Sequence, residues 1–348
     1  MPVPRLAIIG CGGMENAHER GFAGLGGRVQ ITGTADIVLE RAEQAAASLG
    51  AERAVTDYRE LLDDVDAVLI ATPHDLHFEM GRTSLLAGKH VLMEKPLANS
   101  ERDCLELIEL AAKQDRLLMT AYPMRFHPLV TRMKQALDAH EFGDVFHVSM
   151  WTEQYTEYPP GHWGTDAKRL GGGQFFSHGC HYIDLLLWML GRPVRGNHLG
   201  TKLGTPWMAR EGTSDAAIEF ESGALGYHFG TWGARGTRLG YAMHAHCTEG
   251  MLEADITGGA LNLHTADGVQ TLQTFEPDSK NLVGELSHFL DCIETGAAPL
   301  TDGPGSLQGL RVIWRMYQAE QRGVVADLRG LGLDEPWESA GLDRLPER

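Results

Sequence analysis

The first 120 residues alternate short apolar runs with helical patterns, and this alternation restricts the possible folds more than any other feature of the chain. Leu6-Ala7-Ile8-Ile9, residues 66–71 and residues 90–93 are largely apolar, and helical patterns lie at 75–87 and 100–114. Strands that are apolar on both faces are buried on both faces, as in a parallel sheet with helices on either side. The sequence therefore predicts an α/β fold with a doubly wound parallel sheet.

The pattern changes at about residue 123. A helical pattern at 128–140 precedes long strand-like stretches, and amphipathic helices at 282–294 and 305–321 follow them. The strand-like stretches are 144–155, 194–203, 213–221, 224–233, 239–248 and 260–273. Long strands joined by glycine-containing turns favour an α+β domain with a large, mostly antiparallel open sheet. A chain of 348 residues suits two domains, which we place at 1–122 and 123–348.

Composition argues against several classes of partner. The chain has 30 basic and 47 acidic residues, a net charge of -17, which does not attract nucleic acid or an anionic membrane. No apolar run approaches the ~20 residues of a membrane span, and the N-terminus lacks the features of a signal peptide. The five cysteines are scattered and form no Cys-x-x-Cys pair. We therefore expect reduced thiols, a cytoplasmic location and no metal site.

A glycine-rich turn, Gly10-Cys11-Gly12-Gly13, follows the first apolar run directly. The first glycine permits a tight turn, and the second lets the backbone approach a pyrophosphate at the N-terminus of the next helix. The third position of this dinucleotide fingerprint is Glu15 in place of Gly or Ala. Its carboxylate could crowd the helix or repel phosphates, or it could point outward and favour the helix N-terminus.

Asp36 ends the second strand-like run, at about the place where an acidic residue binds a ribose 2'-hydroxyl. A carboxylate there would repel a 2'-phosphate, so we predict NAD rather than NADP as the cofactor. The alternative is a loop aspartate that caps the following helix.

Glu94-Lys95-Pro96 follows the apolar run 90–93. Open α/β sheets hold their ligands at the carboxyl ends of the parallel strands, where Lys95 would lie. Pro96 biases Lys95 away from helical geometry. A fixed ammonium at a nucleotide crevice is a candidate catalytic group, and the alternative is a surface lysine that caps a strand. In the second half, His181 stands three residues before Asp184 in an apolar helical pattern. That histidine is either a proton carrier or a hydrogen-bonded core residue.

Taken together, these motifs resemble those of the glucose–fructose oxidoreductase / inositol dehydrogenase / rhizopine-catabolism oxidoreductase family, nearly end to end. The motifs concerned are Gly10-x-Gly12, Asp36, Ala71-Thr72-Pro73 with His77, Gly88-Lys89-His90-Val91, Glu94-Lys95-Pro96, Arg125-Phe126-x-Pro128 and Gly171-Gly172-Gly173 with His181 and Asp184. The resemblance implies a Rossmann domain and a second domain whose open sheet often mediates assembly, so we expect a homo-oligomer, a dimer or tetramer. It also implies hydride transfer between NAD(P) and a carbon that carries a sugar or cyclitol hydroxyl.

By position, the resemblance assigns Lys95 a hydrogen bond to the reacting oxygen and His181 the exchange of its proton. Ser177 and His178 complete the expected catalytic set. The expected cofactor contacts are Gly10, Gly12, Gly13, Met14, Asp36, Thr72, Pro73, His77, Glu94 and Lys95. Besides Lys95, His178 and His181, the expected substrate contacts are Arg125 and, in the aromatic-rich loop 155–173, Tyr155, His162, Trp163 and Lys168. The alternative for this loop is packing against a neighbouring subunit.

The chain departs from the family pattern at three positions. Ser177 stands where an Asp commonly precedes the catalytic His by four residues, His74 replaces an Asn, and Glu15 replaces the third glycine. Because serine can hydrogen-bond but carries no charge, the altered proton relay leaves two further hypotheses open. One is a redox-neutral, NAD-dependent glycosidase or lyase that works through a 3-keto sugar. The other is a regulator that binds NAD or a sugar without catalysis.

Overall fold

A computed structural model describes residues 3–277 and 280–338, including their side chains except those of residues 14–17. The chain divides into two compact units. The first comprises Met1–Phe126 and Asn281–Ser306, and the second comprises His127–Lys280 and Leu307–Arg348. This division differs from the expected boundary at 122/123, because a segment that follows the second sheet in sequence belongs to the first unit.

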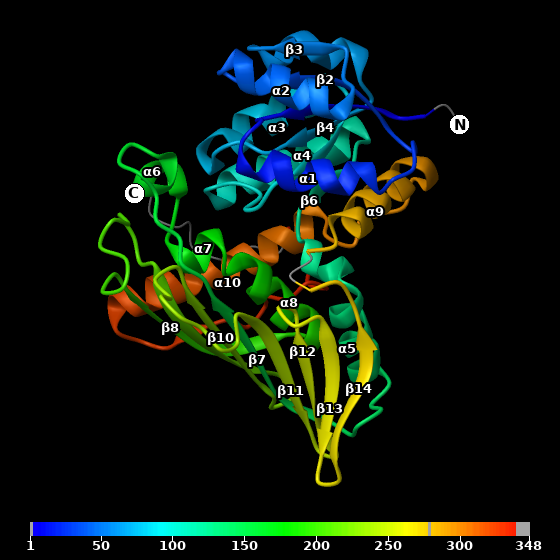
Figure 1. The fold of residues 1–348 in the computed structure, drawn as a ribbon. Coiled ribbons are helices and arrows are strands. Elements are labelled where there is room, and N and C mark those ends of the chain that lie inside the picture. Colours follow the sequence, from blue (N-terminus) through cyan, green and yellow to red (C-terminus); the bar gives the residue numbers. More distant parts are fainter. Residues whose placement is uncertain (1–2, 278–279, 339–348) are drawn as a thin grey trace. The chain divides into compact units, whose positions relative to one another are not determined.

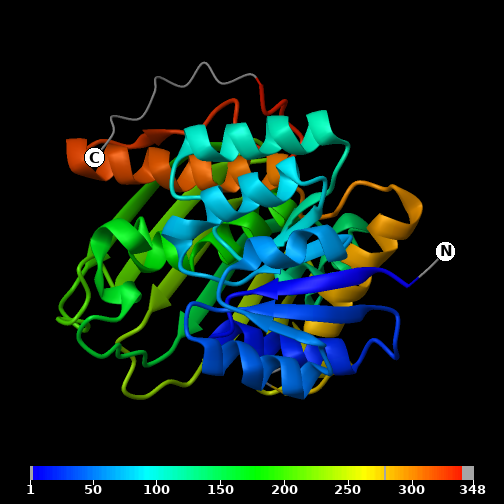
Figure 2. The same cartoon turned by 90° about the horizontal axis from the view of Figure 1, so that it is seen from above.

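The first unit is built on a six-stranded parallel sheet in the order β3-β2-β1-β4-β5-β6. Its strands are β1 (Arg5–Ile9), β2 (Gln30–Ala35), β3 (Arg53–Val55), β4 (Ala67–Ile70), β5 (His90–Met93) and β6 (Leu118–Thr120). Its helices are α1 (Gly13–Ala23), α2 (Leu39–Leu49), α3 (His77–Leu86), α4 (Glu101–Gln114) and α9 (Leu282–Thr295). Figure 2 shows α1 and α2 (blue) on one face of the strands and α3 and α4 (cyan) on the other. The predicted doubly wound parallel sheet is confirmed.

Helix α9 belongs to the first unit because its apolar face completes the core beside α1. Leu286, Phe289 and Leu290 are buried in one cluster with Leu6, Ile8, Phe22 and Ile31. Gly21 of α1 permits the close approach, since a Cβ there would stand 2.8 Å from a methyl group of Leu286. The helix predicted at 282–294 is therefore present, but it packs against the six-stranded sheet of the first unit and not in the second domain, where the sequence order placed it.

The second unit is built on a nine-stranded sheet in the order β14-β13-β12-β11-β7-β10-β9-β8-β15. Its strands are β7 (Val145–Glu153), β8 (Pro193–Thr201), β9 (Thr213–Phe220), β10 (Leu225–Thr231), β11 (Tyr241–Cys247), β12 (Gly250–Asp255), β13 (Ala260–Thr265), β14 (Gly268–Thr274) and β15 (Ala326–Asp327). All neighbours are antiparallel except β7 and β10. This confirms the predicted, mostly antiparallel second sheet.

Two details of that sheet differ from the prediction. The stretch 260–273 is a hairpin of two strands, because the chain reverses between Thr265 and Gly268, where Gly268 has φ +131°. Two short strands were not foreseen: β12, which pairs with β11, and the two-residue β15, which pairs with β8.

Helices of the second unit lie along one face of this sheet (Figure 1). They are α5 (Pro128–Asp138), α6 (Ala167–Leu170), α7 (Gln174–Ser177), α8 (Cys180–Leu190) and, from Leu307 onward, α10 (Gly303–Arg322). Burial alternates along β9, where Ser214, Ala216, Ile218 and Phe220 are buried. This period of two is expected for a sheet with one covered face.

Candidate functional site

The glycine-rich turn leaves open space where a pyrophosphate would approach. Gly10 has φ +94°, and a Cβ there would lie 2.6 Å from Ala71 O, so no side chain fits. At Gly12 and Gly13, in contrast, a Cβ would meet no atom of the described residues within 4 Å. Helix α1 begins at Gly13, so its first N–H groups lie at this opening. These residues fit an anionic cofactor group; the side chains of Met14 and Glu15 lie outside the described residues.

Asp36 follows β2 and ties two backbone segments together. One carboxylate oxygen accepts the Cys11 N–H at 2.9 Å, and the other accepts the Val38 N–H at 2.9 Å. Each oxygen has a further lone pair, so a ribose hydroxyl can bond to the same group. Val38 is the N-cap residue of α2, and no side chain makes a capping hydrogen bond to this helix, so Asp36 closes the turn before α2 and does not cap the helix.

Lys95 follows β5 at the carboxyl edge of the parallel sheet, next to a buried carboxylate. Glu94 is 5% exposed, and one of its oxygens accepts the Lys95 N–H at 3.2 Å. Its other oxygen lies 2.7 Å from Nε2 of His18, whose side chain is completely buried in α1. His18 was not foreseen, because a histidine within a helical pattern gives no signal of its partner 76 residues away.

His77 bridges the loops that follow β4 and β5. Its Nδ1 lies 2.7 Å from Pro96 O and its Nε2 lies 3.0 Å from Thr72 O. Burial lowers the pKa of His77 more than these carbonyls raise it, so the ring is neutral near pH 7 and donates to one of them at a time. The geometry thus gives His77 a role in positioning the two loops. His74 is also buried, and its ring centroid lies 5.7 Å from that of His77.

In the second unit, Ser177 ends α7, and His178 and His181 lie at the junction with α8. Ser177 and His181 are 6% and 7% exposed. The ring of His178 meets that of His181 edge to face at 5.7 Å between centroids, and that of Tyr241 at 6.0 Å. Asp184 is buried one turn further along α8. The structure therefore brings together the three residues expected to handle the proton.

A tyrosine of α10 and a partly buried glutamate hold this junction from the N-terminal side of α7. The Tyr317 hydroxyl accepts the N–H groups of Gly173 and Phe176, at 3.3 and 3.2 Å, and donates to the carboxylate of Glu211. A Cβ at position 173 would stand 2.1 Å from the Glu211 carboxyl carbon, so a side chain there would displace this carboxylate. Burial raises the pKa of Glu211. Neither Tyr317 nor Glu211 was foreseen, because both are remote in sequence from the segment that they hold.

The loop 155–173 combines residues that shape it with residues that face solvent. His162 accepts the Gly164 N–H at 3.0 Å and stacks on Tyr158 at 4.3 Å, while Trp163 packs against the cluster of Leu170, Met208 and Trp232. Tyr155 is 47% exposed, with the Arg235 guanidinium 5.3 Å from its ring centre, and Lys168 is exposed on α6. Arg125 belongs to the first unit, in the short helix Pro123–Phe126, and is buried.

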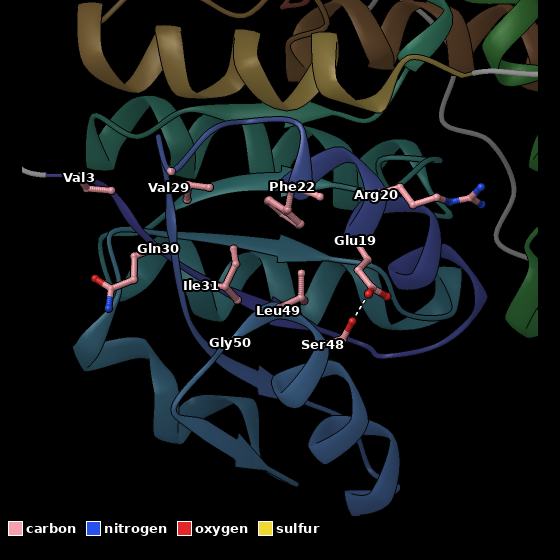
Figure 3. A pocket seen from close by; sticks show the side chains of 12 residues that line it. Val3, Glu19, Arg20, Phe22, Val29, Gln30, Ile31, Ser48, Leu49 and Gly50 are labelled. Carbon is pink, nitrogen blue, oxygen red and sulfur yellow. Dashed lines mark hydrogen bonds between the residues drawn. The ribbon is translucent and has the colours of Figure 1, made fainter. Parts of the chain in front are cut away.

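A pocket of about 680 Å³ lies elsewhere, at the amino-terminal ends of β1 and β2. Phe22, Ile31 and Leu49 line it, and Ser48 donates to Glu19 at its rim (Figure 3). None of the expected site residues whose side chains the structure describes contributes to it. Within the described ranges, no group of three His, Cys, Asp or Glu residues is arranged to hold a metal ion, and no helix is long and apolar enough to cross a membrane.

Comparison with known proteins relates the chain to oxidoreductases. Residues 4–122 match the model of the oxidoreductase family with an NAD-binding Rossmann fold, and residues 130–253 match the GFO/IDH/MocA C-terminal domain. D-xylose 1-dehydrogenase (NADP(+)) 2 of Haloferax volcanii is 30% identical over 83% of this chain and 89% of its own length. The scyllo-inositol 2-dehydrogenase (NAD(+)) of Bacillus subtilis is 27% identical over 85% and 88%.

Among solved structures, levoglucosan dehydrogenase in complex with NADH is similar in fold, with a TM-score of 0.86 at 21% identity, over 93% of this chain and 99% of that one. The glycine turn, the Glu-Lys-Pro segment and the Gly-Gly-Gly/His segment thus lie on the fold that the resemblance implied. The chain belongs to the GFO/IDH/MocA family of NAD-binding oxidoreductases.

Proposed function

We propose that the protein is an NAD-dependent dehydrogenase that transfers hydride between nicotinamide and a ring secondary hydroxyl of a sugar, glycoside or cyclitol. The observation that carries this proposal is Lys95, fixed through Glu94 at the carboxyl edge of a parallel sheet that also carries an open glycine turn. Relatives named as D-xylose and scyllo-inositol dehydrogenases support the substrate class.

The residues of the first unit fit NAD. The N–H groups at Gly12 and Gly13 would bind the pyrophosphate and Asp36 the ribose, with Thr72 and Pro73 on the neighbouring loop. When bound, NAD supplies the acceptor or donor of the hydride. The Asp36 carboxylate disfavours a 2'-phosphate, which supports NAD over NADP even though one relative uses NADP(+).

Lys95 and His181 carry the roles that the chemistry of alcohol oxidation requires. The Lys95 ammonium stabilises the negative charge that develops on the substrate oxygen, and His181 accepts the hydroxyl proton. Ser177 and His178 adjoin His181, where the Ser177 hydroxyl can hydrogen-bond but cannot neutralise an imidazolium. In the reduction direction His181 returns the proton to the same oxygen.

We assign substrate contact to Arg125, His178 and the loop 155–173. The exposed ring of Tyr155 can lie against sugar C–H groups, and the exposed Lys168 ammonium can bind hydroxyls. His162 and Trp163 support the loop through their stacking and core contacts.

The absence of a carboxylate at position 177 favours one second candidate, redox-neutral cleavage. There, oxidation at C3 would acidify the neighbouring C–H, elimination would release the aglycone, and the hydride would return to C3. The cofactor would end in its starting state.

We further infer a cytoplasmic homo-oligomer, a dimer or tetramer, that assembles through the open face of the nine-stranded sheet. Trp151, Tyr227 and Phe229 form an aromatic group on this face, with Trp151 5.5 and 5.6 Å from the other two rings. Reduced cysteine thiols support the compartment.

The proposal is tested with a panel of sugars, glycosides and cyclitols mixed with the protein and NAD, with NADH absorbance and product followed together. We expect NADH to accumulate with one group of substrates; product without net NADH would establish redox-neutral cleavage, and binding without product would refute an enzyme. Lys95→Ala should lower kcat by about 100-fold or more and leave NAD affinity nearly unchanged. Lys89→Ala is the matched control, because Lys89 lies at the opposite end of β5 and donates to Val65 O.

A further inference from the structure

We propose that His18 is a positioning residue for Lys95 and that it acts through the carboxylate of Glu94. The inference rests on the proposed role of Lys95 and adds to it a group that does not touch substrate. Helix α1, which begins at the glycine turn, thereby also fixes the segment that carries the reacting ammonium.

The bond between His18 and Glu94 is short and shielded from water. Nε2 of His18 lies 2.7 Å from one oxygen of Glu94, and the two side chains are 0% and 6% exposed. In such surroundings a hydrogen bond to a carboxylate is strong, and removing one partner leaves the other with an incomplete set of bonds. The orientation of the Glu94 carboxylate therefore depends on His18.

The other carboxylate oxygen passes this constraint to Lys95. It accepts the Lys95 N–H at 3.2 Å, so the plane of the carboxylate sets the backbone at Lys95. On the far side of Lys95, His77 lies 2.7 Å from Pro96 O. Lys95 thus lies between Glu94 and Pro96, each of which contacts a buried histidine. His18 is the histidine that contacts Glu94.

His18 acts as a directional N–H donor. Its Nδ1 is buried and has no hydrogen-bond partner among the described residues. A proton on Nδ1 would lack an acceptor there, whereas a proton on Nε2 points at the Glu94 carboxylate. The contact therefore assigns the donated proton of His18 to Nε2.

The link joins two parts of the proposed site. His18 follows the start of α1 by five residues, or about 7.5 Å along the helix axis. The same helix thus presents N–H groups at the glycine turn and a fixed imidazole to Glu94. The separation between the pyrophosphate position and Lys95 is consequently set within the first unit.

The experiment compares His18→Ala, His18→Gln and His18→Asn in the full chain. A glutamine amide can reach the place of Nε2, whereas an asparagine amide reaches only the place of Nδ1. His90→Ala is the matched control, since His90 is a partly buried histidine of the same sheet that accepts the Leu117 N–H at 3.1 Å. Readouts are kcat, KM, NAD affinity, melting temperature and, without cofactor, hydrogen–deuterium exchange of the peptide covering Val91 to Pro96.

We expect His18→Ala and His18→Asn to lower kcat by about 10- to 100-fold, to change NAD affinity by less than about 3-fold, and to speed exchange at the Lys95 amide. His18→Gln should restore most of kcat and the slow exchange. If His18→Ala does not fold, the His18→Gln and His18→Asn variants still test the positioning role of His18. Equal kcat and equal exchange in these two variants would overturn the inference.

Lys95→Ala distinguishes failure of the proposed function from failure of the role of His18. If Lys95→Ala keeps wild-type kcat, the proposed function of Lys95 fails and the role of His18 fails with it. If Lys95→Ala is inactive but His18→Ala and His18→Asn show wild-type kcat and exchange, only the inference about His18 is wrong.

Discussion

Asp36 shows how one side chain can serve both the fold and the choice of cofactor. Its two oxygens accept the N–H groups of Cys11 and Val38, which fixes the glycine turn against the end of β2. The same charge stands where a 2'-phosphate would have to be accommodated. Two different substitutions of Asp36 are therefore needed to distinguish the effect of losing the charge from the effect of losing the backbone contacts.

Asp36→Asn and Asp36→Ala make that separation. Asn keeps an acceptor for one N–H group and removes the charge. In Asp36→Asn we therefore expect the ratio of the NADP to the NAD dissociation constant to fall about 10-fold, with little loss of stability. Ala should narrow the preference as far and also lower the melting temperature. Dissociation constants for both cofactors and thermal unfolding are the measurements, and a wild-type protein that already prefers NADP would contradict the role of Asp36.

His228 gives a prediction for stability against pH. Burial, with a smaller contribution from the charge of His198, lowers the pKa of His228 to about 3. Its ring stacks on Tyr182 at 4.9 Å, its Nε2 lies 3.3 Å from the Thr152 hydroxyl, and its Nδ1 has no partner among the described residues. A protonated ring would therefore place an uncompensated charge in the core.

Between pH ~6.5, the ordinary histidine value, and about 3, the unfolded chain binds a proton at His228 that the folded chain does not. The free energy of unfolding should thus fall as pH falls through this window, by up to about 1.4 kcal/mol per pH unit from this residue, and this loss should end below pH 3. Denaturant unfolding of wild type and His228→Gln at several pH values measures it. The variant should show the shallower decline, and equal slopes would refute the assignment.

At the scale of elements, the short helix α7 depends on α10 for its start. Tyr317 accepts the N–H groups of Gly173 and Phe176 and donates to Glu211, whose carboxylate fills the space beside Gly173. The four-residue α7 and the first turn of α8 carry Ser177, His178 and His181, so a displacement of α7 reaches the proposed proton carrier.

Tyr317→Phe should lower the free energy of unfolding by about 1 to 3 kcal/mol, because it leaves two N–H groups and the partly buried Glu211 carboxylate without this hydroxyl. It should also reduce kcat while NAD affinity stays unchanged, since Gly12 and Asp36 belong to the first unit. Tyr227→Phe is the matched control, as its hydroxyl donates to Asp215 at the sheet surface. Wild-type kcat in Tyr317→Phe would show that α7 keeps its position without the hydroxyl.

At the scale of the whole molecule, the nine-stranded sheet has one face that the described helices of its own unit do not cover (Figure 1). On that face Trp151 pairs with Phe229 across β7 and β10, and Tyr227 lies beside them. Aromatic side chains grouped in this way are typical of a protein interface. The proposed assembly would bury them between copies of the chain.

Phe229→Glu should therefore reduce the native mass to that of the 38.1 kDa monomer, because it places charges opposite one another in the interface. Sedimentation velocity of the wild type should give a dimer or tetramer. Leu86→Glu is the control, since Leu86 is a half-exposed apolar residue of the first unit. A wild type that sediments as a monomer would contradict assembly through this face.

The sequence by itself determined what depends on local pattern. Apolar runs with helices between them specify a buried parallel sheet, and the glycine turn and Lys95 fall at the ends of such runs, where strand direction alone places them at one edge. The contrast between the two halves of the chain likewise predicted the second, antiparallel sheet.

Only the tertiary structure decided which distant segments meet. Periodicity shows that α9 has an apolar face but not which core receives it, and that face packs beside Phe22 in the first unit. The contacts of His18 with Glu94 and of Tyr317 with Glu211 join residues 76 and 106 positions apart. Such pairs form because a buried polar group needs a hydrogen-bond partner, and the packing of the folded chain decides which residue supplies it. The pattern of residues along the sequence does not identify that partner.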